Sequence, residues 1–229
     1  MTDKIIVTKK LVKIYEESEV KVNALRGVDL TVNEGEFMAI AGPSGSGKTT
    51  LLNIIGGLDV PTEGSVVVGG KDLSGLSKSE LSDMRLNDLG FIFQSYNLIP
   101  VLSALENVEY VMLLQGVPRE ERQRRAVEIL EDVGLGDYID ARPNQMSGGQ
   151  QQRVAVARAI VSSPEVVLAD EPTANLDSET GESLLIMMGE MNEKRGATFI
   201  FSTHDKMVMD HSRRLVKLKD GKIVEDIRK

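Results

Sequence analysis

The sequence predicts an α/β fold with a mainly parallel sheet as its core, an N-terminal antiparallel β lobe and an inserted α-helical lobe. Short strands with turn signals dominate the beginning of the chain, helical patterns fill its middle, and apolar runs typical of buried parallel strands follow. We therefore expect a single domain over 1–229. Its parts are a β lobe at about 1–35 and 60–72, a helical insertion at about 96–162, and a core completed by 163–229.

Six short strands are expected in the first part of the chain. Alternating or compact apolar runs bounded by turn residues indicate them, and the turn Asn33-Glu34-Gly35 closes the third. The six runs are 5–7, 11–15, 28–32, 37–41, 66–68 and 90–94.

Helices follow from Pro118 onward, where apolar residues recur on one face until Gly134 ends the pattern. A second helix is expected to start at Ser147 and to end before Pro164. Two buried parallel strands then follow with a helix between them, and a hairpin around Asp220-Gly221 ends the chain. The strands are 166–170 and 198–202, the helix is 178–194, and the hairpin strands are 215–218 and 222–225.

Composition excludes several classes of function. The 229 residues carry a formal net charge of −8 with acids and bases interspersed, so no nucleic-acid partner is expected. There is no cysteine, which excludes disulfides, thiolate metal sites and cysteine nucleophiles and fits a reducing compartment. No apolar run approaches the length of a membrane span or a signal peptide. We expect a cytoplasmic protein without direct membrane insertion, which would reach a membrane only through a partner.

The most informative motif lies between the predicted strand 37–41 and a helix that includes Thr50. It matches the P-loop pattern, in which glycines turn backbone N–H groups toward nucleotide phosphates at the start of a helix. Lys48 would reach the terminal phosphates and Thr49 would ligate Mg²⁺. The alternative is a glycine-rich turn that only links strand to helix. The motif reads Gly42, Pro43, Ser44, Gly45, Ser46, Gly47, Lys48 and Thr49.

Two adjacent acids follow the predicted strand 166–170, at the carboxyl edge where parallel sheets place their ligands. Asp170 would hold the metal ion directly or through water. Glu171 would act as the general base that polarises the attacking water. The alternative is that both acids cap the following helix. With the P-loop, these acids predict an NTPase core.

A second anion site is expected where Ser147 caps a helix and glycines leave its first N–H groups open. One chain cannot easily use both phosphate sites on one nucleotide, so we expect this site to serve the nucleotide of a second copy. A two-fold dimer would then contain two composite sites. The alternative is an ordinary capped helix. The residues are Ser147, Gly148, Gly149 and Gln150.

Taken in order, these motifs resemble the nucleotide-binding subunit of an ABC transporter over nearly the whole chain. The resemblance implies an ATPase that binds ATP and Mg²⁺, dimerises around them and drives a separate integral membrane permease from the cytoplasmic face. It implies that Gln94 senses the metal and the attacking water, that His204 contacts the γ-phosphate and that Asp177 signals across the dimer. Tyr15 would stack on adenine, or it could be a strand residue that faces the core.

Two positions depart from the family pattern. Met146 stands where leucine is usual, a volume-conserving change that we expect to be tolerated. Ala174-Asn175 alters the usual approach to Leu176-Asp177, which bears on the expected dimer contact.

The chain also resembles, more narrowly, the lipoprotein-releasing and macrolide-exporting branch of ABC ATPases. The cell-division ATPase that partners a related permease is similar to this branch. It rests on 56–64 and on 91–100 followed by 104–108. The cargo is not indicated. Four apolar residues would form a groove for a cytoplasmic helix of the permease, or would pack inside the helical lobe: Leu98, Ile99, Val101 and Leu102.

Other functional classes remain open at this point. The chain could regulate a non-transporting membrane partner, as in cell division. It could also be a soluble ABC ATPase of DNA maintenance or translation, although a long coiled coil has no room between Gln94 and Ser147 and the chain holds one cassette.

Overall fold

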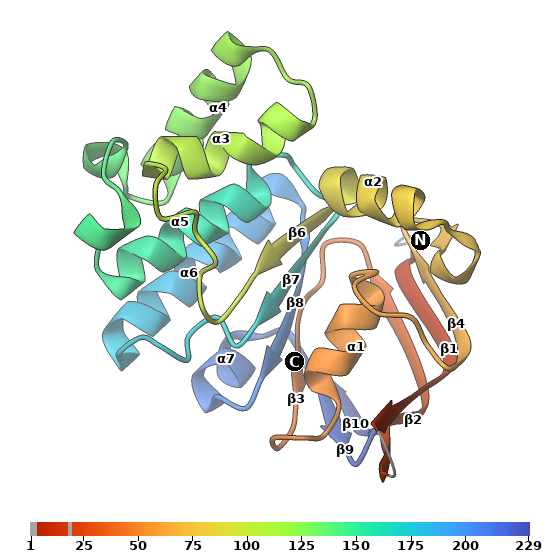
Figure 1. Ribbon diagram of the computed structural model, residues 1–229. Coiled ribbons are helices and arrows are strands. Elements are labelled where there is room, and N and C mark those ends of the chain that lie inside the picture. The colour runs from red at the N-terminus through yellow and green to blue at the C-terminus, as the bar shows by residue number, and fades with distance from the viewer. Residues whose placement is uncertain (1–3, 18–19) are drawn as a thin grey trace.

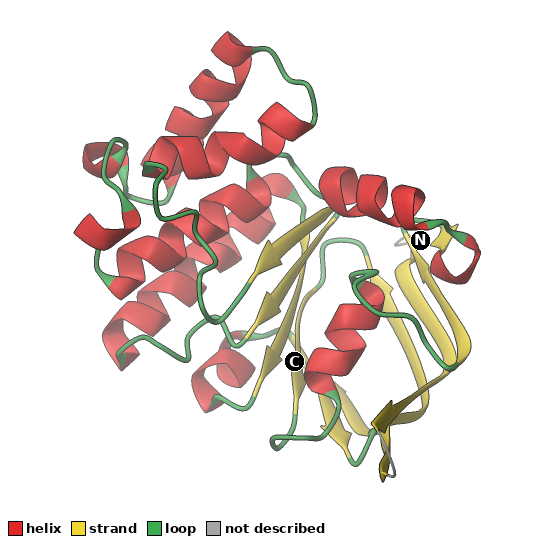
Figure 2. Cartoon of the chain, viewed as in Figure 1, coloured by secondary structure: helices red, strands yellow, loops and turns green. Residues whose placement is uncertain are grey.

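The computed structural model describes residues 4–17 and 20–229, which form two sheets and surrounding helices (Figures 1 and 2). One sheet has the order β10-β9-β3-β8-β7-β6 and the other the order β2-β1-β4-β5. The strands are β1 Lys4–Glu17, β2 Val20–Asn33, β3 Phe37–Ala41, β4 Glu63–Val68, β5 Lys71–Asp72, β6 Leu89–Ile92, β7 Val166–Asp170, β8 Thr198–Thr203, β9 Arg214–Lys219 and β10 Lys222–Arg228. The helices are α1 Lys48–Ile55, α2 Lys78–Asp88, α3 Ala104–Leu114, α4 Arg119–Asp132, α5 Gly148–Ile160, α6 Ser178–Arg195 and α7 Lys206–His211.

The larger sheet is the middle layer of the molecule. Strands β6, β7, β8, β3 and β9 pair in parallel and β10 closes the edge antiparallel, which confirms the predicted mainly parallel core. Because side chains alternate along a strand, β3 supplies both faces. Phe37 and Ala39 belong to a core shared with α3 to α6, whereas Met38 and Ile40 belong to a core shared with α1 and the β lobe.

The smaller sheet is antiparallel, as predicted, and packs on the α1 side (Figure 1). The two strands expected within 5–15 form one strand, β1. The register against β2 shifts between Thr8 and Leu11, and Lys10 has a φ of 45°. The bulge keeps apolar side chains on the core face although the alternation is interrupted, so the sequence showed two short runs where the chain has one bent strand.

The helical lobe comprises α3, α4 and the beginning of α5 (Figure 1). The predicted helices correspond to α4 after Pro118, α5 after its cap Ser147, and α6. Three helices were not individually predicted, α2, α3 and α7, although α3 lies within the predicted helical insertion. Helix α2 buries only Met84, so it has no apolar stripe to detect, and α7 is a single short segment between β8 and β9.

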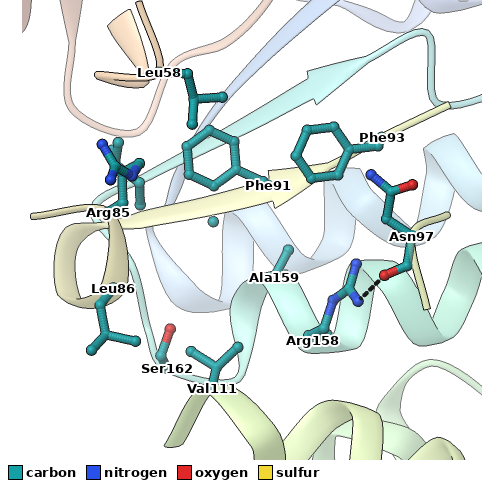
Figure 3. A pocket seen from close by; sticks show the side chains of 12 residues that line it. Leu58, Arg85, Leu86, Phe91, Phe93, Asn97, Val111, Arg158, Ala159 and Ser162 are labelled. Atoms are coloured by element: carbon teal, nitrogen blue, oxygen red, sulfur yellow. Dashed lines mark hydrogen bonds between the residues drawn. The ribbon is translucent and has the colours of Figure 1, made fainter. Parts of the chain in front are cut away.

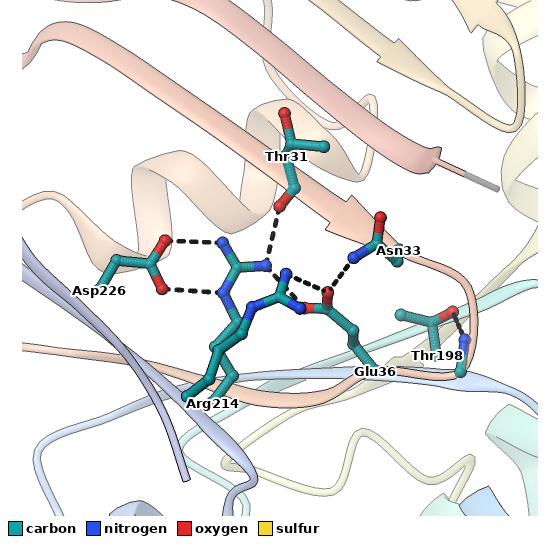
Figure 4. A network of polar contacts seen from close by, with 8 residues as sticks. Thr31, Asn33, Glu36, Thr198, Arg214 and Asp226 are labelled. Atoms are coloured by element: carbon teal, nitrogen blue, oxygen red, sulfur yellow. Dashed lines mark hydrogen bonds and ion pairs between the residues drawn. The ribbon is translucent and has the colours of Figure 1, made fainter. Parts of the chain in front are cut away.

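Arg214 at the start of β9 fastens the two sheets together (Figure 4). Its guanidinium donates to the backbone carbonyl of Thr31 in β2, to Glu36 before β3, and to both carboxylate oxygens of Asp226 in β10. The Arg214 side chain is 8% exposed. The largely buried guanidinium makes charge-assisted hydrogen bonds to both sheets, so this network holds the β lobe against the strand that leads into the P-loop.

Candidate functional site

The predicted strand, loop and helix around the P-loop motif are all present. Strand β3 ends at Ala41, the loop covers 42–47, and α1 begins at Lys48. Gly47 caps α1 with a φ of 101°, and a Cβ at this position would lie 2.4 Å from the carbonyl oxygen of Ala24. Only glycine fits this conformation and this approach. The alternative of a simple connecting turn does not account for a helix start that opens onto a cavity, described below.

Lys48 is folded back onto its own loop. Its ammonium donates to the carbonyl oxygens of Gly42 at 2.8 Å and Pro43 at 3.1 Å, and the residue is buried. Ser46 is also buried, and its hydroxyl has no hydrogen-bond partner among the described residues. The backbone carbonyls hold the ammonium at the loop, where a phosphate group would offer it stronger, charged partners.

The two acids at the end of β7 take different positions. Asp170 accepts from the Thr49 hydroxyl, with its two oxygens at 3.2 and 3.3 Å. Glu171 has a φ of 47°, and its backbone N–H donates to the carbonyl of Ser202 in β8. The alternative that this pair caps a helix is wrong, since α6 begins at Ser178 and its cap is Asp177. The left-handed backbone at Glu171 instead places its side chain beside the end of β8, where it contacts Thr203.

Glu171 and His204 meet at the carboxyl ends of β7 and β8. Glu171 Oε1 lies 2.7 Å from His204 Nδ1, and Oε2 accepts from the Thr203 hydroxyl at 3.2 Å. The Glu171 side chain is 15% exposed and that of His204 is 69% exposed. A carboxylate in contact with solvent on one side and held on the other can accept a proton from a water molecule.

A cavity of about 470 Å³ collects most of the predicted nucleotide-contacting residues. The predicted residues that line it are Tyr15, Ser44, Gly45, Gly47, Lys48, Thr49, Thr50, Gln94, Glu171 and His204. Val22, Asn23 and Ala24 of β2 also line it and were not predicted, because nothing in their sequence distinguishes them from other strand residues. Gly42 and Pro43 line a separate apolar hollow beside β9.

Tyr15 lies at this cavity and is half-buried, not enclosed in the core. Its hydroxyl donates to Asp59 at 2.7 Å. Burial raises the pKa of the Tyr15 phenol, and the hydrogen bond to the Asp59 carboxylate raises it further. The ring is therefore neutral and available at the cavity wall.

The second predicted phosphate site lies at the start of α5, outside this cavity. None of its four residues lines the cavity. Ser147 caps α5 by accepting from the Gln150 N–H, while Gln150 Oε1 accepts from the Ser147 N–H at 2.8 Å. A Cβ at Gly148 would meet the Tyr96 hydroxyl at 2.8 Å, and one at Gly149 would meet Thr180 at 2.4 Å. Met146 before this motif is buried in the core.

Asp177 caps the start of α6, and Gln94 lies in the loop after β6. Asp177 accepts from the backbone N–H and the hydroxyl of Thr180, and these bonds lower the pKa of its carboxyl group. The Asn175 side chain donates to the backbone carbonyl of Gln94 at 2.8 Å. The altered residue Asn175 thus joins the segment before α6 to the loop after β6.

A second, more apolar cavity of about 390 Å³ opens between β6, α2, α3 and α5 (Figure 3). The rings of Phe91 and Phe93 stack along it with centroids 5.9 Å apart, and Leu58 and Leu86 complete its apolar wall. Arg158 donates to the backbone carbonyls of Tyr96 and Asn97 at its edge. Leu98, Ile99, Val101 and Leu102, which we expected to help form a groove for a permease helix, do not line this cavity.

The alternative for those residues holds for one of them. Leu98 packs against the core of the helical lobe, whereas Val101 is 69% exposed. Phe91 and Phe93 went unnoticed because they occupy a strand that looked fully internal.

The described part of the protein offers few clustered side-chain ligands for a metal ion. Within residues 4–17 and 20–229, histidine, aspartate and glutamate form no group of three or more that could hold a metal ion. Thr49 and Asp170 offer one hydroxyl and one carboxylate close together. Oxygen ligands in this number suit Mg²⁺ that completes its shell with phosphates and water. In the same described ranges, no helix has the length and apolarity to cross a membrane.

Comparisons with known proteins agree with this geometry. The family model for the ABC transporter matches residues 25–174. The lipoprotein-releasing system ATP-binding protein LolD of Alcanivorax borkumensis is 46% identical over 95% of this chain and 95% of its own. The macrolide export ATP-binding/permease protein MacB of Aggregatibacter actinomycetemcomitans is 45% identical over 98% of this chain, which spans 35% of that protein.

Among solved structures, the cassette MJ0796 of Methanocaldococcus jannaschii superposes with a TM-score of 0.89. It shares 44% sequence identity over 97% of this chain and 98% of that one. That structure is described as a dimeric post-hydrolysis state bound to ADP and Pi.

Proposed function

The chain belongs to the ABC transporter family, in the branch of LolD and MacB, as an ATP-hydrolysing subunit, and on that premise we propose how it works. Two copies close around two molecules of MgATP and open after hydrolysis. The motion drives a separate integral membrane permease that holds the subunit at the cytoplasmic face of the membrane. The system is of the lipoprotein-release or macrolide- and peptide-export type. The relatives do not favour a cell-division regulator or a soluble ATPase of DNA maintenance or translation.

One observation carries the proposal. The cavity gathers Lys48, Gln94, Glu171 and His204 around the P-loop, yet Ser147 and its neighbours, which form the second anion site, are not part of it. We infer that a second copy completes this site, in a two-fold dimer that would bring each copy's α5 start over the other's cavity. The dimeric structure of MJ0796 with ADP and Pi supports self-association of this kind of cassette.

The P-loop residues bind the phosphates in this proposal. The backbone N–H groups of Ser44 to Thr49 and the start of α1 attract the β- and γ-phosphates. Lys48 leaves the carbonyls of Gly42 and Pro43 and takes the terminal phosphates as partners. Thr49, Asp170 and Gln94 would hold Mg²⁺, and the ion would supply positive charge against the phosphate oxygens.

Glu171 and His204 carry the chemical step. Glu171 accepts a proton from the attacking water, and Thr203 keeps one of its oxygens in place. The His204 side chain is exposed and contacts Glu171 through Nδ1. It can therefore turn to the γ-phosphate and stabilise its charge. Asp177 signals the state of this site to the partner copy.

The apolar cavity beside β6 is the docking groove for the permease. Phe91, Phe93 and Leu58 offer an apolar floor of the kind that receives one face of an amphipathic helix. Phe93, which lines the groove, directly precedes Gln94 in the chain. Movement of the docked helix would therefore displace Gln94, which is held at its backbone by Asn175.

Mixing two inactive variants tests whether the site is shared. A Ser147→Arg chain and a Lys48→Ala chain each spoil both sites of their own homodimer. If the sites are shared, one site of a mixed dimer combines the intact Lys48 of one chain with the intact Ser147 of the other. Half of the dimers are mixed after equal mixing, so about a quarter of the wild-type number of sites should be restored. ATP turnover after mixing measures this, with each variant alone as the control. No recovery at any ratio would count against the shared site.

A further inference from the structure

The hydroxyl of Tyr15 is engaged before any nucleotide arrives. It donates to Oδ2 of Asp59 at 2.7 Å. Tyr15 belongs to β1 and lines the nucleotide cavity, whereas Asp59 follows α1 and lines neither cavity. The contact therefore joins the cavity wall to a residue outside it.

The Asp59 carboxylate is itself held on its other oxygen. Oδ1 accepts from the Lys13 ammonium at 2.6 Å and from the backbone N–H of Val60 at 2.7 Å. Lys13 also donates to the Val60 carbonyl, and its ammonium lies 4.8 Å from the centroid of the Tyr15 ring. The side chains of Lys13 and Asp59 are 11% and 24% exposed. Each member of this cluster thus limits the movement of the others.

The carboxylate stays ionised at neutral pH. Burial acts to raise the pKa of Asp59, but hydrogen bonds from Lys13 and Tyr15 outweigh it and lower the pKa below its ordinary range. An ionised carboxylate only accepts hydrogen bonds. Its bond with Tyr15 therefore has the phenol as donor, and the hydroxyl proton is committed to Asp59.

The backbone around Asp59 is tied to both neighbouring elements. Leu58 donates to the carbonyl of Asn53 in α1 at 2.8 Å. Thr62 donates through its backbone N–H to Val12 at 2.8 Å and accepts from the N–H of Ile14 at 3.0 Å, both in β1. The carboxylate consequently has a fixed place relative to the P-loop helix and to the strand that carries the ring.

We propose that Asp59, held by Lys13, is a positioning residue that orients the Tyr15 ring for stacking on the nucleobase. This rests on the proposed function, ATP binding in this cavity, and on the adenine contact that the family resemblance implies for Tyr15. A free tyrosine side chain loses rotamer freedom when a ligand orders it, whereas a ring already held at its hydroxyl loses less. The ring then contacts the base through its face, because its hydroxyl is occupied.

The proposal separates binding of the base from binding of the phosphates. MgADP contacts both parts of the site, while magnesium pyrophosphate contacts only the P-loop part. Dissociation constants of both probes are measured by calorimetry for the wild type, Tyr15→Phe, Asp59→Ala and the double variant. Asp59→Ala and Tyr15→Phe should each weaken MgADP binding about fivefold, the cost of ordering one side chain, and leave pyrophosphate binding unchanged.

The double variant should bind MgADP no more weakly than either single variant, because both remove the same contact. Asp72→Ala is the matched control, since Asp72 also accepts hydrogen bonds in the β lobe but only from Ser74. It should bind both probes as the wild type does. Tyr15→Phe retains the ring and removes only the donor, so it carries the test if Asp59→Ala fails to fold.

Three results would overturn the proposal: unchanged MgADP binding in Asp59→Ala, an equal loss for both probes, or losses that add in the double variant. Tyr15→Ala distinguishes this failure from that of the adenine contact. If Tyr15→Ala binds MgADP as tightly as the wild type, the adenine contact itself is wrong and the positioning role falls with it. If Tyr15→Ala weakens MgADP binding and Asp59→Ala does not, only the role of Asp59 is wrong.

Discussion

Glu171 Oε1 and His204 Nδ1 lie 2.7 Å apart, although the two residues are 33 positions apart in the sequence. The contact exists because β7 and β8 are parallel neighbours, so that Asp170 pairs with Ser202 and the residues after both strands emerge at the same edge. The histidine is exposed while the carboxylate is mostly covered. This pair places a mostly covered carboxylate and an exposed imidazole side by side at the nucleotide cavity.

Removing the histidine should slow hydrolysis without abolishing nucleotide binding. His204→Ala is expected to lower kcat about 100-fold, because a single preorganised contact to the reacting phosphate is lost. KM for ATP should change much less, and steady-state phosphate release measures both. His211→Ala is the control, since that ring contacts the Met207 carbonyl within α7 and should leave turnover unchanged. Equal effects of the two substitutions would remove His204 from the site.

Two glycines of the P-loop should differ in their tolerance of a methyl group. Gly47→Ala combines a φ of 101° with a Cβ that would lie 2.4 Å from the Ala24 carbonyl, whereas Gly45 has a φ of 77° with nothing within 4 Å. Gly45→Ala should cost about 1–2 kcal/mol of unfolding free energy, the cost of a left-handed residue. Gly47→Ala should cost clearly more. Urea unfolding without nucleotide compares them, and equal losses would contradict the close approach at Gly47.

The network around Arg214 predicts a loss of stability in acid. Hydrogen bonds from Arg214 lower the pKa of Asp226 below its ordinary value of 3.8. A lowered folded-state pKa contributes stability above the ordinary value, and this contribution is lost as the pH falls through the lowered value. Asp226→Asn should therefore lower the unfolding free energy near pH 7 and lessen its decline below about pH 4.

Urea unfolding between neutral pH and pH 3 gives that dependence, with exposed Asp140→Asn as the control. The effect is modest, because Asp226 is 41% exposed and solvent screens its charge. An acid decline identical to that of the wild type would show that Asp226 and Arg214 are not coupled.

Local patterns predicted the parts of the site that lie within one stretch of chain. The P-loop between β3 and α1, the acids after β7 and the cap at Ser147 each have their structure encoded in neighbouring residues. The parallel order of β7 and β8 was also predictable, since buried apolar runs separated by a helix favour that pairing.

Contacts between distant segments were not predictable in the same way. Asp59 meets Tyr15 across 44 positions, and nothing local to either residue specifies the pair. Val22 to Ala24 reach the cavity only because β2 pairs with β1. The sequence did not indicate that Phe91 and Phe93 line an apolar cavity, because a short apolar strand gives no sign of which face stays uncovered.

The central claim is that two copies enclose ATP and that Glu171 removes the proton from water. Glu171→Gln keeps the shape of the side chain but not its basicity, so turnover should cease while MgATP still binds. Light scattering with size-exclusion chromatography, with and without MgATP, measures the state of this variant. We predict a monomer that becomes a dimer holding one unhydrolysed ATP per chain. Retained turnover, or a monomer with ATP bound, would contradict the account.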